Sequence, residues 1–137
     1  MPVRAIIIVY RKPGLSLEEF KHRYEAHIQL IRRIVGDDFP LFHRRSYIAR
    51  QTVATPPEGA STRNATTPAT LLAGQQADFD FDAMAELTFA DQAAFQAFAA
   101  KVYAPDAAAQ IAADEEGFLD RSKLAISMLE DVIEMTK

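Results

Sequence analysis

The chain has 137 residues, of which 49% are hydrophobic and 25% are charged, and its formal net charge is −4. This length and composition predict a single domain over residues 1–137 with a substantial core. The absence of cysteine excludes a disulfide scaffold, a thiolate metal site and a cysteine nucleophile, and the acidic balance argues against binding to nucleic acid or an anionic membrane.

Residues 4–10 are β-branched and apolar on both faces, which is typical of a buried central strand. The apolar run is too short for a signal peptide or a membrane span, so we expect a cytoplasmic protein without membrane contact. A helix is predicted over 17–35. Ser16 can cap the amide of Glu19 at its start, and Gly36 can end it.

The predicted helix carries one apolar stripe that should face the core. Its members are Phe20, Tyr24, His27, Ile28, Ile31, Ile34 and Val35. A second, more polar strand follows over 41–50 and suits a sheet edge. Residues 51–76 are rich in Thr, Ala and Pro and predict a long loop, either a functional lid or a disordered segment. The loop offers few core anchors, so we expect it to be dispensable for folding.

Residues 78–89 alternate between apolar and polar, which predicts a strand. Phe81 lies on its apolar face, and Asp82 and Glu86 share the opposite face. Helices are predicted from Asp91 to about 102 and over 105–117, and a last strand from 124 to about 135.

Two strand–helix–strand units in this order predict an α+β fold of the ferredoxin-like type, with a four-stranded antiparallel sheet and helices on one face. Strands this apolar cannot leave the other face in water. We therefore expect a homodimer in which two sheets pack face to face, as in a dimeric α+β barrel.

Several segments together resemble the EthD family of dimeric α+β barrels, especially its fungal members. They are YRKPG at 10–14, LEEF at 17–20, YEAHIQL at 24–30, FDAMAELTF at 81–89 and DEEGFLD at 114–120. The resemblance covers the chain apart from the loop at 51–76. Gln29 departs from the pattern, since the family usually has proline two residues after the histidine.

The resemblance implies a small enzyme or binding protein that needs no cofactor. Relatives include decarboxylases and dehydratases of fungal aromatic polyketide pathways, and more distantly olivetolic acid cyclase and quinone-forming monooxygenases. Related barrels bind haem. Function varies widely within the superfamily, so the fold alone does not decide it.

His27 is the main candidate for chemistry, because an imidazole titrates near neutral pH and this one lies within an apolar stripe whose burial would lower its pKa. The alternative is a core histidine bonded to a backbone carbonyl. Tyr24 and Tyr47 are predicted hydrogen-bond partners for a substrate, or else amphipathic residues at the core edge. His43 shares the strand face of Tyr47 but is expected to be exposed, and His22 is expected at the surface.

Phe81, Phe95 and Phe98 are predicted to wall an apolar substrate pocket. Asp82 and Glu86 are predicted to border it, with Arg44 or Arg4 as a partner. No metal site is expected, because the acidic residues would extend along a strand and lack histidine ligands.

The leading hypothesis is a cofactor-independent lyase or cyclase, of decarboxylase or dehydratase type, that acts on an aromatic or polyketide-like molecule by acid/base catalysis. A second is a non-catalytic protein that binds a hydrophobic ligand or a partner enzyme. A third is a haem-binding or cofactor-free monooxygenase relative in which His27 would be an axial ligand.

Overall fold

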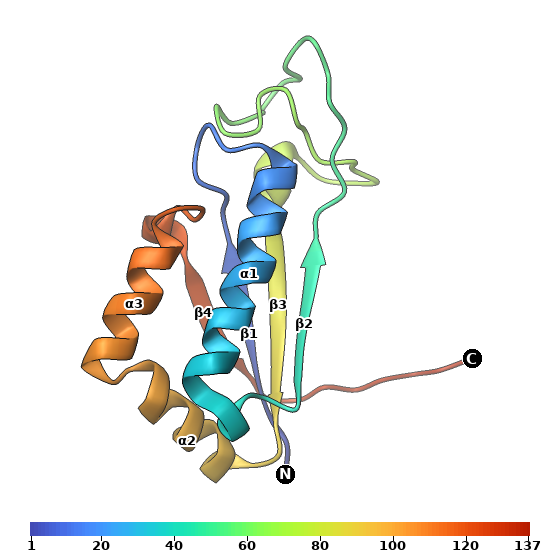
Figure 1. The fold of residues 1–137 in the computed structure, drawn as a ribbon. Coiled ribbons are helices and arrows are strands. Elements are labelled where there is room, and N and C mark those ends of the chain that lie inside the picture. Colours follow the sequence, from blue (N-terminus) through green and yellow to red (C-terminus); the bar gives the residue numbers. More distant parts are fainter.

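Strand β1 (Val3–Val9) lies inside a four-stranded antiparallel sheet in the computed structural model, which describes residues 1–137 (Figure 1). The strand order is β2 (Phe42–Tyr47), β3 (Ala83–Phe89), β1 and β4 (Ala125–Leu129). Only β1 and β3 have two neighbours, which fits the apolar character of β1 and the polar character of the edge strand β2. This βαββαβ order confirms the predicted ferredoxin-like fold.

Three helices cover one face of the sheet (Figure 1). They are α1 (Leu17–Val35), α2 (Gln92–Val102) and α3 (Pro105–Glu115). The predicted arrangement of helices on a single face is therefore confirmed. None of these helices is both long and apolar enough to cross a membrane.

Local sequence signals fix both ends of α1. The Ser16 hydroxyl accepts a hydrogen bond of 3.1 Å from the Glu19 amide, and Gly36, at φ 55°, ends the helix. This positive φ favours glycine, because a Cβ would make the conformation strained. The apolar stripe is buried as predicted apart from Ile34, which is half-buried.

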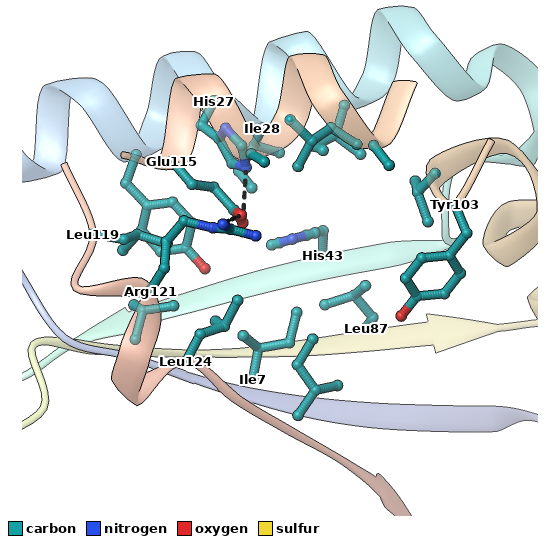
Figure 2. A pocket seen from close by; sticks show the side chains of 18 of the residues that line it. Ile7, His27, Ile28, His43, Leu87, Tyr103, Glu115, Leu119, Arg121 and Leu124 are labelled. Atoms are coloured by element: carbon teal, nitrogen blue, oxygen red, sulfur yellow. Dashed lines mark hydrogen bonds and ion pairs between the residues drawn. The ribbon is translucent and has the colours of Figure 1, made fainter. Parts of the chain in front are cut away.

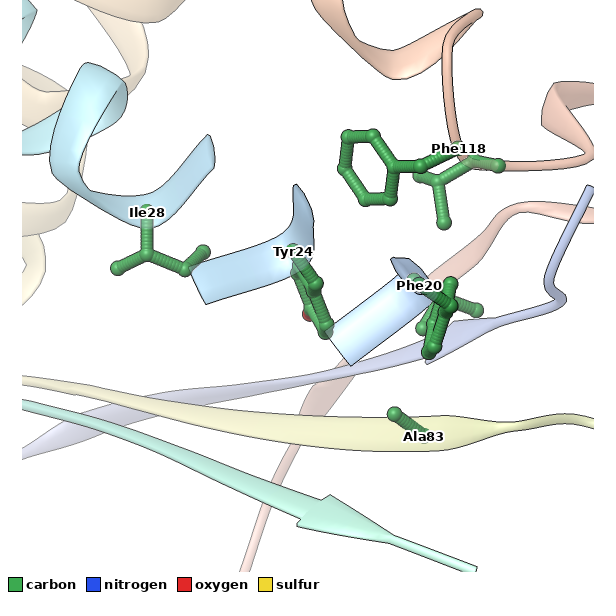
Figure 3. Packing of buried hydrophobic residues seen from close by; sticks show 7 residues of the cluster. Phe20, Tyr24, Ile28, Ala83 and Phe118 are labelled. Atoms are coloured by element: carbon green, nitrogen blue, oxygen red, sulfur yellow. The ribbon is translucent and has the colours of Figure 1, made fainter. Parts of the chain in front are cut away.

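The main core lies between α1 and one end of the sheet (Figure 3). Phe20, Tyr24 and Ile28 reach from α1 toward Ala83 of β3, while Phe118 packs against the Phe20 and Tyr24 rings. Because Ala83 has a small side chain, it leaves room on β3 for the aromatic rings from α1. This packing fixes the rotation of α1 and so decides where His27, on the same stripe, points.

The opposite sheet face has no covering layer within the chain. Ile6 and Ile8 of β1 lie on it, beside Met84 of β3 and Phe42 of β2. Met84 is 39% exposed and Phe42 is 67% exposed. An apolar face of this kind in water is unfavourable for a lone chain.

Three predicted strands are shorter in the structure, and one of them is β2, which spans Phe42–Tyr47 rather than 41–50. Strand β3 begins at Ala83 rather than residue 78, because Gln76–Phe79 form a 3-10 helix. Asp78 turns back to accept a hydrogen bond from the Gln75 amide, which suits a turn rather than an extended strand. Strand β4 ends at Leu129, and residues 130–137 continue away from the fold without regular structure (Figure 1).

The segment 51–76 is anchored by buried polar groups. The Arg63 side chain donates to the Arg11 carbonyl and to Asp120, and Asn64, 2% exposed, accepts from Arg11 and donates to Asp80. The segment is thus part of the fold rather than a disordered insertion. The expectation that it contributes little to folding overlooked these polar anchors, because only apolar ones were considered.

Candidate active site

A cavity of about 440 Å³ lies between the helices and the helix-facing side of the sheet. Its wall is mostly aliphatic and comes from every layer of the domain. The apolar lining residues are Ile7, Val9, Ile28, Ile31, Leu87, Phe98, Val102, Ala108, Ile111, Ala112, Leu119, Leu124 and Ile126. A space of this size and character suits a small, largely apolar molecule.

Few polar side chains interrupt this wall (Figure 2). They are Tyr24, His27, His43, Tyr103, Glu115 and Arg121. Hydrogen-bonding groups that are few and fixed within an apolar wall can orient a ligand.

His27 lies between two carboxylates at one end of the cavity. Its Nδ1 is 2.7 Å from Oδ2 of Asp114, and its Nε2 is 3.6 Å from Oε2 of Glu115. The other Glu115 oxygen, Oε1, accepts a hydrogen bond of 3.2 Å from Nε of Arg121 (Figure 2). The short Asp114 contact fixes the ring, while the longer Glu115 contact leaves the Nε2 proton available to a ligand.

Burial lowers the pKa of His27, but its interactions with Glu115 and Asp114 outweigh burial, and the pKa lies above its ordinary value. The sequence led us to expect the opposite, because burial was considered without the two carboxylates. The two carboxylates therefore favour the protonated ring, which carries a proton on each nitrogen and can donate one.

Two further polar side chains, Tyr24 and His43, line the cavity. The Tyr24 hydroxyl and Nε2 of His43 make no hydrogen bond within the protein. Neither atom is fully buried, because Arg11 Nε is the only fully buried side-chain nitrogen or oxygen without a partner. Burial raises the pKa of Tyr24, so its hydroxyl stays protonated and can donate.

The structure brings together three of the predicted site residues, Tyr24, His27 and Phe98, around one cavity. Tyr47 lies outside it, because its hydroxyl donates to Glu25 at 2.6 Å. Phe81 packs against Tyr10 and Phe79, and Phe95 packs against Phe89, so neither lines the cavity.

Asp82 and Glu86 lie in separate environments. Asp82 precedes β3 and accepts hydrogen bonds from the Arg11 amide at 2.7 Å and from Arg50 Nε at 3.1 Å. Glu86 lies on the open sheet face, 3.9 Å from Arg44, which is one of the two partners predicted for it. Neither carboxylate lines the cavity, because Asp82 is held by Arg11 and Arg50 ahead of β3 and Glu86 lies on the opposite face of the sheet.

The sequence interpretation missed His43, Glu115 and Arg121. His43 was expected to be exposed because it begins a run of basic residues, yet its position on β2 turns it toward the helices. The two-residue period had already put His43 on the strand face of Tyr47, so the error was to give more weight to its basic neighbours than to this period. Nothing in the sequence spacing indicates that Glu115 and Arg121 meet His27.

No segment of 51–76 lines the cavity, so a role as its lid is not supported. No group of three or more His, Asp or Glu side chains is placed to hold a metal ion. The histidines also fit haem ligation poorly. Both His27 nitrogens face carboxylates. Nδ1 of His43 lies 3.0 Å from Arg45, which can only donate, so the Nδ1 lone pair is used and the proton of the neutral ring is on Nε2. Neither ring therefore offers a free lone pair in its present arrangement.

The chain is thus a small α+β domain with a mostly apolar cavity between its helices and its sheet. The chain belongs to the EthD family, whose model matches residues 12–122. The EthD family inferred from the sequence motifs is thereby confirmed, and the likeness to its fungal members stays a prediction.

Two solved structures share the fold at low sequence identity. The Arabidopsis thaliana protein At3g17210 is 14% identical, with 98% of this chain and 99% of that chain covered and a TM-score of 0.54. An EthD-family protein from Bacillus halodurans is 18% identical, with 96% and 100% covered and a TM-score of 0.50. No curated protein matches the sequence.

Proposed function

We propose that this protein is a cofactor-independent lyase or cyclase, of decarboxylase or dehydratase type, acting on an aromatic or polyketide-like molecule inside the cavity. The observation that carries the proposal is the arrangement of His27, whose Nδ1 is held by Asp114 while Nε2 lies 3.6 Å from Glu115, at a mostly apolar cavity that both residues line. A histidine positioned in this way, with carboxylates that favour its protonated form, is suited to proton donation.

For a β-keto acid or an ortho-hydroxy aromatic acid the step would be as follows. The C–C bond to the carboxylate breaks, CO₂ leaves, and the electron pair stays on carbon as an enolate or its aromatic equivalent. Nε2 of His27 then donates its proton to that carbon, and the imidazole regains a proton from water. The aliphatic wall disfavours the carboxylate over neutral CO₂, which assists the bond cleavage.

The other polar residues have defined tasks in this proposal. Asp114 orients His27 and stabilises its charged form. Glu115 faces the Nε2 proton and is itself held by Arg121. The protonated Tyr24 hydroxyl can hydrogen-bond a substrate oxygen from the same wall.

The proposal is tested by incubating the purified wild-type protein with aryl β-keto acids and measuring the release of CO₂. A protein that binds such acids without converting them would instead be a non-catalytic carrier of a hydrophobic ligand, and the mostly apolar cavity favours this second candidate. Addition of haem followed by an absorption spectrum tests the third candidate. We expect no specific complex, because ligation would break the existing contacts of the histidines.

We further propose that the protein is a homodimer whose open sheet faces pack together. The support is the uncovered apolar surface that contains Ile6, Ile8, Met84 and Phe42. The cavity lies on the opposite side of each sheet, so each chain would keep its own site.

A further inference from the structure

His43 projects into the middle of the cavity from β2, between His27 and Leu87 as seen in Figure 2. In the sheet it lies opposite Leu87 of β3, which places its side chain on the helix-facing side. The ring of Phe39 stacks on it, with ring centroids 6.1 Å apart and an angle of 19° between the planes. Backbone pairing and stacking together fix the orientation of this imidazole.

Arg45 determines which nitrogen of His43 carries the proton. Nη1 of Arg45 is 3.0 Å from Nδ1 of His43 and 2.9 Å from the carbonyl oxygen of the same residue. A guanidinium has only donors, so Nδ1 must be the acceptor and carry no proton. In the neutral ring the proton is then on Nε2, the nitrogen that has no partner in the protein.

The arginine is itself held in place. Glu25 accepts from Arg45 Nε at 2.7 Å and from Nη2 at 2.9 Å, and Tyr47 donates to the same carboxylate. A bidentate arginine–carboxylate pair has a defined geometry and is stronger than a single contact. Tyr47, which lies outside the cavity, therefore belongs to the chain of contacts that orients His43.

The charges around His43 favour its neutral form. Burial lowers the pKa of His43 to about 4, and the Arg45 charge acts in the same direction. The carbonyl of His43 itself and the Glu25 carboxylate raise this pKa, and the charge of His27 lowers it, but these effects are smaller than burial and Arg45. The two rings thus differ: the surroundings of His27 favour its charged form, and those of His43 favour the neutral form.

We propose that His43 is a ligand-binding residue that donates a hydrogen bond from Nε2–H to a carbonyl or phenolic oxygen of the ligand, with Arg45 as the residue that fixes this tautomer. This rests on the proposed use of the cavity as the ligand site. The expected ligand is a mostly apolar molecule that carries an acceptor oxygen near its centre. A neutral donor suits an oxygen that gains negative charge during reaction, because it stabilises that charge without transferring its own proton.

Binding of two matched probes, 2-acetylnaphthalene and 2-ethylnaphthalene, tests the donor. They have similar shape, and only the ketone has an acceptor oxygen. The chain contains no tryptophan, so their fluorescence can be followed directly. We expect the wild type to bind the ketone roughly 2- to 10-fold more tightly, the range of one neutral hydrogen bond. His43→Phe should abolish the preference and His43→Gln, which keeps an N–H, should restore part of it.

His27→Gln should retain the preference for the ketone, and this separates the two proposals. If His27→Gln loses turnover but still prefers the ketone, both the proton-donor role of His27 and the ligand-binding role of His43 are supported. If the wild type shows no turnover but prefers the ketone, only the role of His43 is supported. An unchanged preference in His43→Phe overturns the assignment. Failure of the wild type to bind either probe overturns the ligand site and the assignment with it.

Imidazole ¹⁵N NMR tests the tautomer without any ligand. The three histidines can be assigned with single His→Gln variants. We expect His43 in the wild type to show a protonated Nε2 and an unprotonated Nδ1, with no titration above about pH 5. In Arg45→Met the tautomer should become mixed and the pKa should rise. A protonated Nδ1 in the wild type at neutral pH would overturn the assignment.

Discussion

Nδ1 of His27 on α1 and Oδ2 of Asp114 on α3 lie 2.7 Å apart, although the residues are 87 positions apart in the chain. The contact joins two helices beside the cavity and sets the direction of the other ring nitrogen. The alternative considered from the sequence was a histidine bonded only to a backbone carbonyl. Such a partner would orient the ring but would bring no negative charge next to it. The carboxylate makes the charged form of the ring stable, which is what a proton donor requires.

His27→Gln should leave the protein folded and lower turnover by roughly 10²- to 10⁴-fold, the range of a positioned proton-transfer group. Glutamine keeps a hydrogen-bonding side chain on α1 but cannot donate a proton at neutral pH. The measurement is a single-turnover rate together with a thermal melt. His22→Gln is the matched control, because His22 lies on the exposed side of the same helix. If folded His27→Gln turned over at the wild-type rate, the residue would have no part in the mechanism.

Asp114→Asn should lower turnover less than His27→Gln does and shift its pH dependence. In the wild type, turnover that depends on protonated His27 should fall as pH rises through its raised pKa. The neutral amide removes one of the charges that raise this pKa, so the fall should occur at lower pH. A pH–rate profile for both proteins provides the test. Identical profiles would show that Asp114 does not control His27.

The same pKa shift predicts the pH dependence of stability. The pKa of His27 is near 6.5 in the unfolded chain and higher in the folded protein. Its contribution to stability is therefore fully present below about pH 6.5 and is lost as pH rises through the folded-state pKa. Urea unfolding across this interval should show a smaller decline in His27→Gln than in the wild type.

The fold was predictable because it depends on local patterns. The two-sided apolar character of β1, the Ser16 cap and the alternation within β3 each act over a few residues. The errors arose where distant polar groups decide the conformation. Asp82 fits an alternating strand by sequence, but the buried guanidinium groups of Arg11 and Arg50 place it in a different environment.

The site was predictable only in part, for the same reason. His27 and Tyr24 follow from the helical period of one stripe. Asp114 and Glu115 reach His27 only because α3 packs against α1, and no short-range pattern encodes that contact. His43 is turned inward by its register on β2, although its basic neighbours indicate exposure.

Asp82→Asn should destabilise the fold by about 3–5 kcal/mol, the usual cost of removing one partner from a buried ion pair. The Asp82 side chain is 2% exposed, and the charged Arg11 and Arg50 side chains would lose the carboxylate that both of them contact. Asp38→Asn is the matched control. Asp38 follows α1, away from the open sheet face, and its pair with Lys101 of α2 is partly exposed, so the change should cost about 0–1 kcal/mol. Equal midpoints in urea for the two variants would contradict this account.

Replacement of residues 53–67 by a Gly/Ser linker should also lower the melting temperature substantially. It removes Arg63 and Asn64, which hold Arg11, Asp80 and Asp120 at the end of the sheet. Because the segment does not line the cavity, affinity for the naphthalene probes should survive in the folded fraction. A melting temperature close to that of the wild type would restore the view that the segment is dispensable.

Light scattering at micromolar concentration should give twice the 15.2 kDa mass of one chain, if the open sheet faces pack together as proposed. Phe42→Glu should shift the mass to that of a single chain, because it puts a charge on the apolar face where the partner would lie. Phe42 is 67% exposed in the single chain, so the change should not disturb the monomer fold. Leu72→Glu is the control, since Leu72 is fully exposed but lies in the 51–76 segment. A wild-type mass of 15.2 kDa would reject the dimer, and a Phe42→Glu protein that remained dimeric would place the interface elsewhere.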